Sequence, residues 1–265
     1  MPMAAVAIAA LAAAGVDGVS GGHDSAPPTP KARATAMAAA ANASLPLKGK
    51  IVGIDPGHNG HNYLHPKIIN RQVFNGRNWE DCDTTGTDTN GGYTEARFNF
   101  LVASYLRADL IRDGAKVVMT RTANNGVGPC VTTRSYIINE AHANVAVDIH
   151  ADGACSTCRG FSIIEPEAYY KSPNGKVIVP SERLGADIKA AMLAGTPMPV
   201  SNYYGVNGFI HRDDLAGLNL TKVPKILIEI GNMKNTTDAR LETSTTFQQE
   251  VARALLAAIV KFLAR

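Results

Sequence analysis

The feature that most constrains this chain is a short apolar strand, residues 50–55, that runs directly into the sequence Pro-Gly-His and so presents His58 at its end. Two later apolar runs end in a similar manner, one at His150 and one around Glu229. In open α/β sheets, ligands bind beyond the carboxyl ends of the strands. We therefore expect these three side chains to lie close together and to converge on one metal ion.

Beyond the N-terminal region, apolar runs with strand character alternate with segments whose apolar residues recur at helical spacing. This alternation predicts one α/β domain over residues 46–265, with a twisted, mostly parallel or mixed sheet that carries helices on both faces. Residues 59–92 are too long for an ordinary connection, which is typical of a functional or disulfide-tied loop. Residues 195–210 are expected to form turns. We expect strands over residues 50–55, 115–120, 144–150, 160–165 and 225–230, and helices over residues 95–112, 132–143, 181–193 and 245–263.

The composition is that of an ordinary globular protein, with 45% hydrophobic and 18% charged residues, so a sizeable core can form. The net charge of +3 is small, and the sequence has neither a run of like charges nor a basic stripe interleaved with aromatic residues. Proteins that bind nucleic acid usually carry such a stripe. We therefore expect no nucleic acid partner.

The N-terminal region, residues 1–45, differs in composition from the rest. Residues 3–15 form an alanine-rich apolar run, which Gly, Ser and Pro follow. The run is shorter than the roughly 18 to 20 residues that cross a bilayer, so we expect no stable membrane span. It resembles the apolar part of a secretory signal followed by a flexible linker, which predicts export to the periplasm, the cell wall or the medium. No Lys or Arg precedes the run, which leaves a disordered Ala-rich tail as the alternative.

The four cysteines agree with export, because disulfides form in oxidising compartments. Cys82 and Cys130 stand alone in two loops, whereas Cys155 and Cys158 form a close pair. We expect two disulfides, Cys82–Cys130 and Cys155–Cys158. Two alternatives fit less well: a four-cysteine zinc site needs metal-like spacing in both pairs, and a redox pair usually opens a helix after a strand.

The side chains at the strand ends suit a catalytic zinc, which commonly has two histidines and a carboxylate as ligands and keeps a fourth position for water. His58 and His150 supply the imidazoles, and His211 is a weaker candidate for the wall of the cleft. Glu95 is the candidate carboxylate, because it starts a predicted helix just after a turn and can point back to the sheet edge. Glu229 interrupts an apolar strand, where a carboxylate is costly unless it faces a cleft. It is therefore the candidate base that moves the proton.

Each of these residues also has a purely structural interpretation. A histidine at a strand end can simply be hydrogen-bonded within the fold. Glu95 can be a helix-start acid that interacts favourably with the helix macrodipole, and Glu229 can pair with an arginine such as Arg212. Asp55 and Asp152 can be turn residues, or either can orient a ligand histidine from behind.

Four motifs occur in order along the chain: Ile-Asp-Pro-Gly-His-Asn-Gly at 54–60, Gly-Tyr-Thr-Glu at 92–95, Ile-His-Ala-Asp at 149–152 and Ile-Leu-Ile-Glu-Ile-Gly-Asn-Met-Lys-Asn at 226–235. Each motif alone is weak, but together they resemble the zinc-dependent N-acetylmuramoyl-L-alanine amidases of the amidase-3 type. The sequence is most similar to the single-domain peptidoglycan amidases of mycobacteria and related actinobacteria. In these enzymes the phrase Asp-Leu-Ala-Gly-Leu-Asn-Leu, here residues 214–220, and a loop cysteine pair also recur. The resemblance covers about residues 48–265.

The resemblance implies that His58, Glu95 and His150 bind Zn2+ and that Glu229 is the catalytic glutamate. It also implies hydrolysis of the amide between the lactyl group of N-acetylmuramic acid and L-alanine of the stem peptide, in cell-wall remodelling or cell separation. Peptidoglycan or a muropeptide is then the substrate, and we expect a monomer. The close cysteine pair at residues 155–158 is not a general feature of the family. Two alternatives remain open: another cell-wall zinc peptidase, and a non-catalytic peptidoglycan-binding protein.

Overall fold

The computed structural model describes residues 29, 31, 45–169 and 171–265 of the chain. The signal-like segment predicted for residues 1–45 therefore lies almost entirely outside the described residues. Ser44–Arg265 form one compact unit. Within the part of the chain that the structure describes, no helix is both long enough and apolar enough to cross a membrane.

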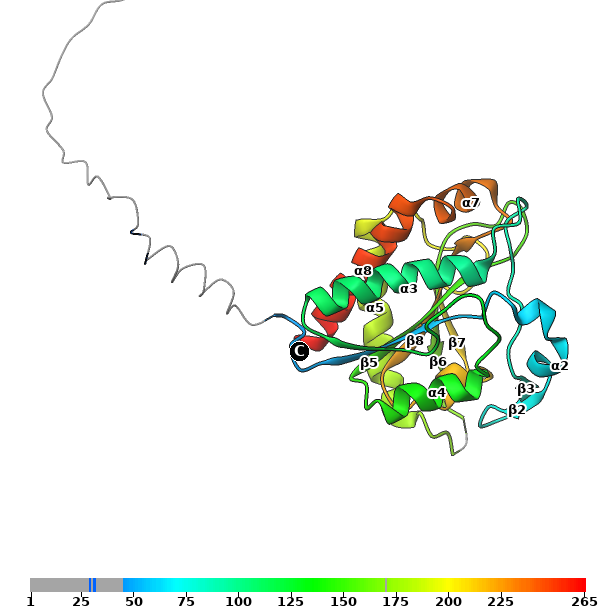
Figure 1. Cartoon of the computed structure of the whole chain (residues 1–265), viewed down its shortest axis with the longest axis horizontal. Helices are drawn as coiled ribbons and strands as arrows, with labels where there is room; N and C mark the ends of the chain where they lie inside the picture. The colour runs from blue at the N-terminus through cyan, green and yellow to red at the C-terminus, as the bar shows by residue number, and fades with distance from the viewer. Residues whose placement is uncertain (1–28, 30, 32–44, 170) are drawn as a thin grey trace, which may run out of the picture. The chain divides into compact units, whose positions relative to one another are not determined.

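A six-stranded sheet forms the centre of this unit (Figure 1). In spatial order, its strands are β4 (Lys116–Met119), β1 (Ile51–Pro56), β5 (Val145–Asp152), β8 (Lys225–Asn232), β6 (Ser162–Pro166) and β7 (Phe209–Arg212). The first four strands are parallel, β6 pairs antiparallel with β8, and β7 pairs parallel with β6. The sheet is thus mixed and mostly parallel, which confirms the predicted fold class.

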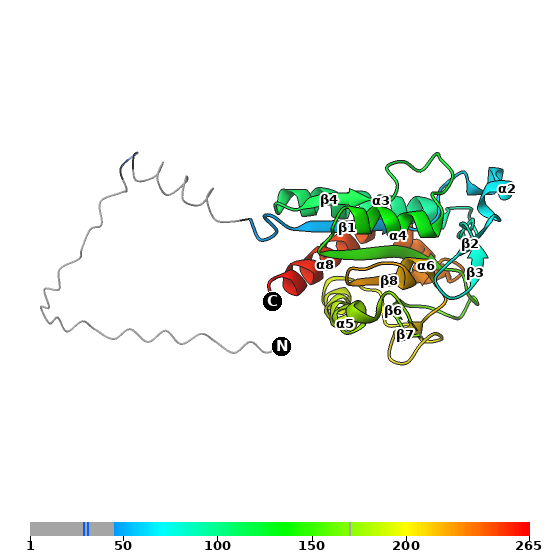
Figure 2. The same cartoon turned by 90° about the horizontal axis from the view of Figure 1, so that it is seen from below.

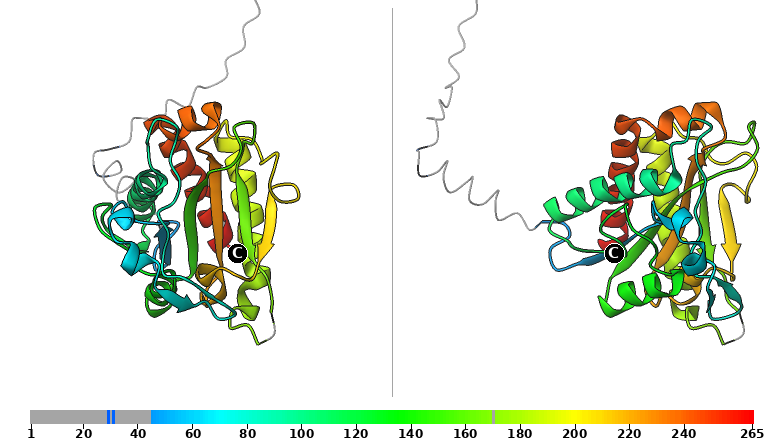
Figure 3. Two further views of the ribbon diagram at one scale, coloured as in Figure 1. Left: turned by 90° about the vertical axis from the view of Figure 1, so that its right-hand side faces the viewer. Right: turned by 45° about the vertical axis from the view of Figure 1, so that its right-hand side comes forward.

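Helices cover both faces of the sheet, as the alternation of elements predicts (Figure 3). Three long helices pack on one face: α3 (Glu95–Arg112), α5 (Ile178–Gly195) and α8 (Thr245–Leu263). Two helices pack on the other: α4 (Val131–Glu140) and α6 (Ala216–Asn219). Phe98 and Leu255 share the larger core with Ile149 of β5. Ile138 of α4 packs against Ala146 of the same strand, in a smaller core on the opposite face.

Two local features fix the elements that carry the site. β5 is apolar on both faces, with Val147 in the larger core and Ala146 in the smaller one, as expected for a central strand of a parallel sheet. α3 begins after Thr94, whose hydroxyl accepts a hydrogen bond from the backbone N–H of Arg97. This cap satisfies one of the unpaired donors of the first helical turn, and it places Glu95 at the start of the helix.

The sequence-based prediction is wrong or incomplete for some element bounds and for the short elements. Residues 195–210, predicted as turns, include the start of β7, and α4 spans Val131–Glu140 instead of residues 132–143. The predicted long loop contains four short elements: η1 (Asn62–Leu64), α2 (Pro66–Ile69), β2 (Gln72–Phe74) and β3 (Trp79–Asp81). Elements of three or four residues are too short to show an apolar period. The β2–β3 hairpin lies at the end of the sheet away from the C-terminus (Figure 2).

Both predicted disulfides, Cys82–Cys130 and Cys155–Cys158, are present, and no cysteine is free. The four-cysteine zinc site is therefore excluded. The first disulfide joins the segment that follows the β2–β3 hairpin to the residue that precedes α4. It therefore ties the long polar segment to the body of the domain.

Candidate metal centre and cleft

A cleft of about 550 Å³ opens beyond the carboxyl ends of β1, β5 and β8. His58, Glu95, His150 and Glu229, the four residues singled out from the sequence, all line it. The other walls come from the end of the hairpin segment, including Asp83, and from α6 with the residues before it. The cleft thus lies where ligands bind in open α/β sheets.

His58, Glu95 and His150 meet at one point in this cleft. Nε2 of His58 lies 3.1 Å from Oε1 of Glu95, and Nδ1 of His150 lies 2.8 Å from the same oxygen. One donor atom from each residue lies within 4.8 Å of the other two. Two imidazoles and a carboxylate are a common donor set of catalytic zinc sites, so the three residues can hold a metal ion.

Close backbone approach makes this convergence possible. A Cβ atom on Gly57 would lie 2.2 Å from Nε2 of His150, so only glycine leaves space for the imidazole there. Gly86 plays the same part for the other two residues, because a Cβ atom would lie 2.7 Å from both Glu95 and His58. His58 itself has a φ angle of 58°, which is costly for a residue with a side chain.

Three donors hold the Glu95 carboxylate in place. Oε2 accepts a hydrogen bond from the backbone N–H of Thr87 at 2.9 Å. Oε1 accepts hydrogen bonds from the backbone N–H of Ala151 at 3.2 Å and from the Asn99 amide at 3.3 Å. Burial raises the pKa of Glu95, but His58 and His150 together outweigh burial and hold the pKa well below its ordinary value. The carboxylate is therefore charged and oriented.

The surroundings of the two imidazoles are negative. Burial lowers the pKa of His58, but Glu95 and Asp83 outweigh burial and raise the pKa to about 9. Burial also lowers the pKa of His150, while Asp148 and Glu95 together raise it well above the ordinary value. A site that holds protons on both imidazoles also favours a metal cation between them.

Glu229 lies on β8, directly beside His150 in the register of the sheet. Its Oε2 atom is buried and has no hydrogen-bond partner among the described residues. Burial raises the pKa of Glu229 to about 8, with a partly opposing effect from His150. The alternative pairing with Arg212 is wrong, because Arg212 binds the carboxylate of Asp214 through two contacts of 2.8 and 2.9 Å. Glu229 can therefore exchange a proton near neutral pH.

A buried network of charges lies behind the imidazoles, and the sequence analysis did not find it. Asp83 lies 3.6 Å from Nδ1 of His58, and Asp148 lies 3.3 Å from Nε2 of His150. Asp55, for which the sequence left open a turn residue or a residue that orients a histidine, is paired instead with cations. Two cations, Arg134 and Lys225, each join Asp55 to a second aspartate. The four ion pairs are Arg134–Asp55 at 3.0 Å, Arg134–Asp83 at 3.0 Å, Lys225–Asp55 at 2.7 Å and Lys225–Asp148 at 3.1 Å.

One signal in the sequence could have revealed Asp148. It interrupts an apolar strand two residues before His150, as Glu229 interrupts β8, and a buried carboxylate needs a partner in either place. Asp152, for which the same two interpretations were open, accepts a hydrogen bond from the hydroxyl of Tyr203 at 2.7 Å. His211, the weaker candidate for the cleft wall, lines a separate pocket together with residues of β6 and α5.

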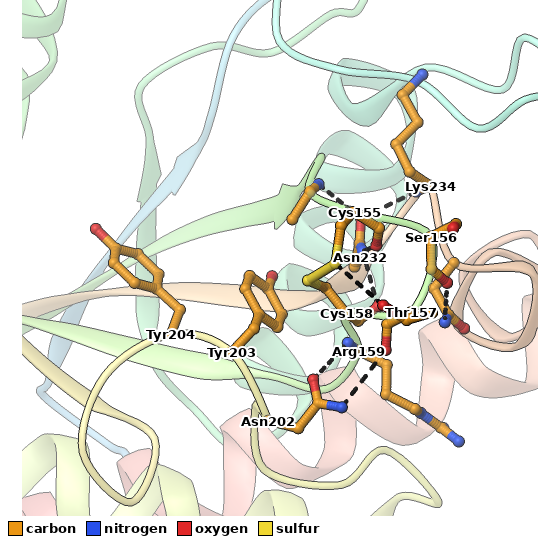
Figure 4. The surroundings of a disulfide bond; sticks show 12 residues. Cys155, Ser156, Thr157, Cys158, Arg159, Asn202, Tyr203, Tyr204, Asn232 and Lys234 are labelled. Atoms are coloured by element: carbon orange, nitrogen blue, oxygen red, sulfur yellow. Dashed lines mark hydrogen bonds between the residues drawn. A yellow bond between two sulfur atoms is a disulfide. The ribbon is translucent and has the colours of Figure 1, made fainter.

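The Cys155–Cys158 disulfide closes a turn shortly after Gly153, which lines the cleft (Figure 4). The amide of Asn232, at the end of β8, donates hydrogen bonds to the carbonyl groups of both cysteines at 2.8 Å. The amide of Asn235 donates to the carbonyl of Ser156 at 2.7 Å. The turn that follows β5 is thereby fastened to the segment that follows Glu229.

Comparison with protein families gives one match that covers most of the chain. Residues 52–261 match the family model described as N-acetylmuramoyl-L-alanine amidase. Among individual proteins, the N-acetylmuramoyl-L-alanine amidase Rv3717 of Mycobacterium tuberculosis is 39% identical over 237 residues, which cover 88% of this chain and 95% of that protein.

Solved structures give the same result. The N-acetylmuramyl-L-alanine amidase Ami1 from Mycobacterium smegmatis superposes with a TM-score of 0.76 at 36% identity, covering 82% of this chain and 98% of that one. The apo form of Ami1 from Mycobacterium abscessus superposes with a TM-score of 0.75 at 37% identity, covering 82% of this chain and all of that one (100%). The region that matches the family model, residues 52–261, contains all the residues that line the cleft.

Proposed function

Because this chain belongs to the N-acetylmuramoyl-L-alanine amidase family, we propose that it uses one zinc ion, held by His58, Glu95 and His150, to cleave the amide between the lactyl group of N-acetylmuramic acid and L-alanine of the stem peptide. The protein is a peptidoglycan amidase of this family.

The observation that carries the proposal is the meeting of three donor atoms within 4.8 Å of one another, in a cleft that also contains Glu229. Zinc in such a site is a Lewis acid that polarises a carbonyl oxygen and makes water acidic enough to attack at neutral pH. The Glu95 carboxylate is held by Thr87, Ala151 and Asn99, so the donor set is oriented before any ligand arrives.

Glu229 moves the proton in this reaction. Its carboxylate takes a proton from the attacking water, and the same proton passes to the nitrogen of L-alanine as the carbon–nitrogen bond breaks. The products are a lactyl carboxylate on the sugar and a stem peptide with a free amino group. Burial, which raises the pKa of Glu229, supports this role, because it makes the carboxylate a stronger base than an exposed glutamate.

The experiment that tests the function is mass spectrometry of the products from a defined muropeptide. We expect intact stem peptide that begins with L-alanine, loss of this product after chelation, and its return when zinc is added. A peptidase would leave L-alanine on the muramic acid, and a binding protein would release nothing in the presence of stoichiometric zinc. Either result contradicts the proposal.

We further propose that the protein acts outside the cytoplasm as a monomeric catalytic domain of residues 46–265, with residues 1–45 as its export segment and linker. The substrate lies in the cell wall, and the two disulfides need an oxidising compartment. Thiol titration of the denatured, unreduced protein from the culture medium or cell envelope tests this. We expect no free thiol, and four free thiols would contradict export.

A further inference from the structure

One buried carboxylate oxygen beside the candidate metal centre lacks a hydrogen bond within the described part of the fold. Oδ1 of Asp148 is buried and has no hydrogen-bond partner among the described residues that meets the usual geometry. Such an oxygen is costly unless a donor reaches it. Nε2 of His150 lies 3.3 Å away, just beyond the ordinary N–H···O range of about 2.7–3.2 Å, so a small shift of the ring would make its N–H that donor.

The other oxygen of Asp148 fixes the direction of the carboxylate. Oδ2 lies 3.1 Å from Nζ of Lys225, which is only 1% exposed and also contacts Asp55 at 2.7 Å. Gly217 of α6 covers this pair, because a Cβ atom there would lie 3.1 Å from Oδ2 and 3.2 Å from Nζ. Lys225 therefore holds one oxygen, and the free oxygen of Asp148 is turned to the imidazole.

The imidazole of His150 is confined on its remaining sides. Its Nδ1 atom lies 2.8 Å from Oε1 of Glu95 and so faces the candidate metal centre. The edge of the ring that carries Nε2 lies against the backbone of Gly57. The two ring nitrogens thus have different surroundings, one facing the metal site and the other facing a carboxylate.

We propose that Asp148, anchored by Lys225, is a positioning residue that keeps the proton of His150 on Nε2 and so presents Nδ1 as the metal-binding nitrogen. A metal-binding imidazole is neutral, and the hydrogen bond made by one ring nitrogen decides which nitrogen binds the metal. The inference rests on the proposed metal site, which it deepens by assigning the nitrogen and the residue that selects it.

Nitrogen-15 NMR of the zinc-loaded wild-type protein tests the assignment without any substitution. We expect His150 to show zinc bound at Nδ1 and a proton on Nε2. Zinc bound at Nε2 of His150 would overturn the inference while leaving the proposed function intact. If the wild-type protein binds no stoichiometric zinc, the proposed function fails and the inference fails with it.

The variant Asp148→Asn tests the role of the carboxylate. The ammonium of Lys225 is a donor only, so it takes the amide oxygen of the new residue and turns the amide NH2 group to Nε2. That arrangement favours a proton on Nδ1, the wrong nitrogen for binding. We expect zinc affinity, measured by competition with a chromophoric chelator, to fall by about 10- to 100-fold.

A second substitution separates positioning from mere structural support. In Asp148→Asn/Lys225→Met, the amide oxygen is free to turn to Nε2, so zinc affinity should recover in part even though another buried polar group has been lost.

The matched control is Asp187→Asn, which removes a buried aspartate that pairs with Lys261 and Arg265 on the opposite side of the sheet from Asp148. Its zinc affinity should match that of the wild type. Folded Asp148→Asn protein with wild-type zinc affinity, or a double variant weaker than the single one, would overturn the inference.

Discussion

At the scale of single residues, the site depends on polar side chains at buried strand positions, where an apolar side chain would cost less to bury. His150, Asp148 and Glu229 all interrupt strands at the centre of the sheet. Each is costly to bury without a partner. In the structure, His150 and Asp148 lie beside each other, whereas Oε2 of Glu229 has no hydrogen-bond partner among the described residues. That oxygen is the atom through which the proposed proton transfer runs.

Glycine at position 57 is required by the same site, because the His150 ring occupies the space of a Cβ atom. We expect Gly57→Ala to displace the ring, to weaken zinc binding at least tenfold, and to lower the free energy of unfolding by about 1–3 kcal/mol. Chelator competition and urea unfolding measure the two effects. Gly91→Ala is the matched control, since its Cβ atom would meet nothing closer than 3.8 Å. Wild-type zinc affinity in Gly57→Ala would show that the ring is not confined in this way.

The residues behind the imidazoles could be predicted only in part. His58, Glu95 and His150 are recognisable from their motifs and from the positions of the strand ends. Asp83 comes from the long polar segment, and Arg134 from the middle of α4. Nothing in their neighbouring sequence indicates that they pair with each other, or that Arg134 also pairs with Asp55. Their pairing depends on how distant segments pack, which local pattern does not contain.

At the scale of elements, long and strongly patterned segments were predicted well. The bounds of α3 and α8 agree with the apolar spacing of their sequences, because both helices bury one face against the same core. The β2–β3 hairpin and β7 were missed. They have three or four residues each, and their formation depends on pairing with other parts of the chain and not on their own sequence.

The two disulfides close loops of very different length. Cys82–Cys130 spans 48 residues, whereas Cys155–Cys158 spans 3. In the chain-entropy model, closing the longer loop contributes roughly 4 kcal/mol and the shorter one roughly 2 kcal/mol. We therefore expect Cys82→Ser/Cys130→Ser to lower Tm more than Cys155→Ser/Cys158→Ser does. Thermal unfolding of both double variants measures the difference. A larger loss of Tm in the variant without the short disulfide would contradict this ranking.

At the scale of the whole molecule, one buried charge network connects β1, α4, β5 and β8 beneath the cleft. Asp55 is its centre, because it pairs with both Arg134 and Lys225. The network joins the two sides of the metal site, since Asp83 lies beside His58 and Asp148 beside His150. The arrangement of the site is therefore coupled to the stability of the sheet.

This network makes stability sensitive to acid. Burial raises the pKa of Asp55, but Lys225 and Arg134 outweigh burial and hold the pKa well below its ordinary value of 3.8. The stability that Asp55 contributes is complete above pH 3.8 and is lost as the pH falls below that value towards the lower pKa of the folded state. Through Asp55, the free energy of unfolding of metal-free protein should thus begin to fall at about pH 5 and should be clearly lower at about pH 3.

The variant Asp55→Asn isolates this contribution. It should be less stable than the wild type at neutral pH, because it leaves two buried cations short of a carboxylate. It should also lose less stability on acidification, since it lacks the group that takes up the proton. Urea unfolding at both pH values measures the two slopes. Equal losses in the two proteins would show that Asp55 does not contribute to the acid sensitivity.

We propose that three side chains hold one zinc ion while a fourth moves the proton, and this division of roles is tested by measuring zinc content and turnover together in Glu229→Gln. We expect one zinc per chain, as in the wild type, with turnover reduced on the order of 10²- to 10⁴-fold. The exposed variant Glu140→Gln should match the wild type in both measurements. Folded Glu229→Gln protein that keeps its turnover would show that Glu229 does not move the proton, and folded protein that loses its zinc would show that Glu229 also holds the metal.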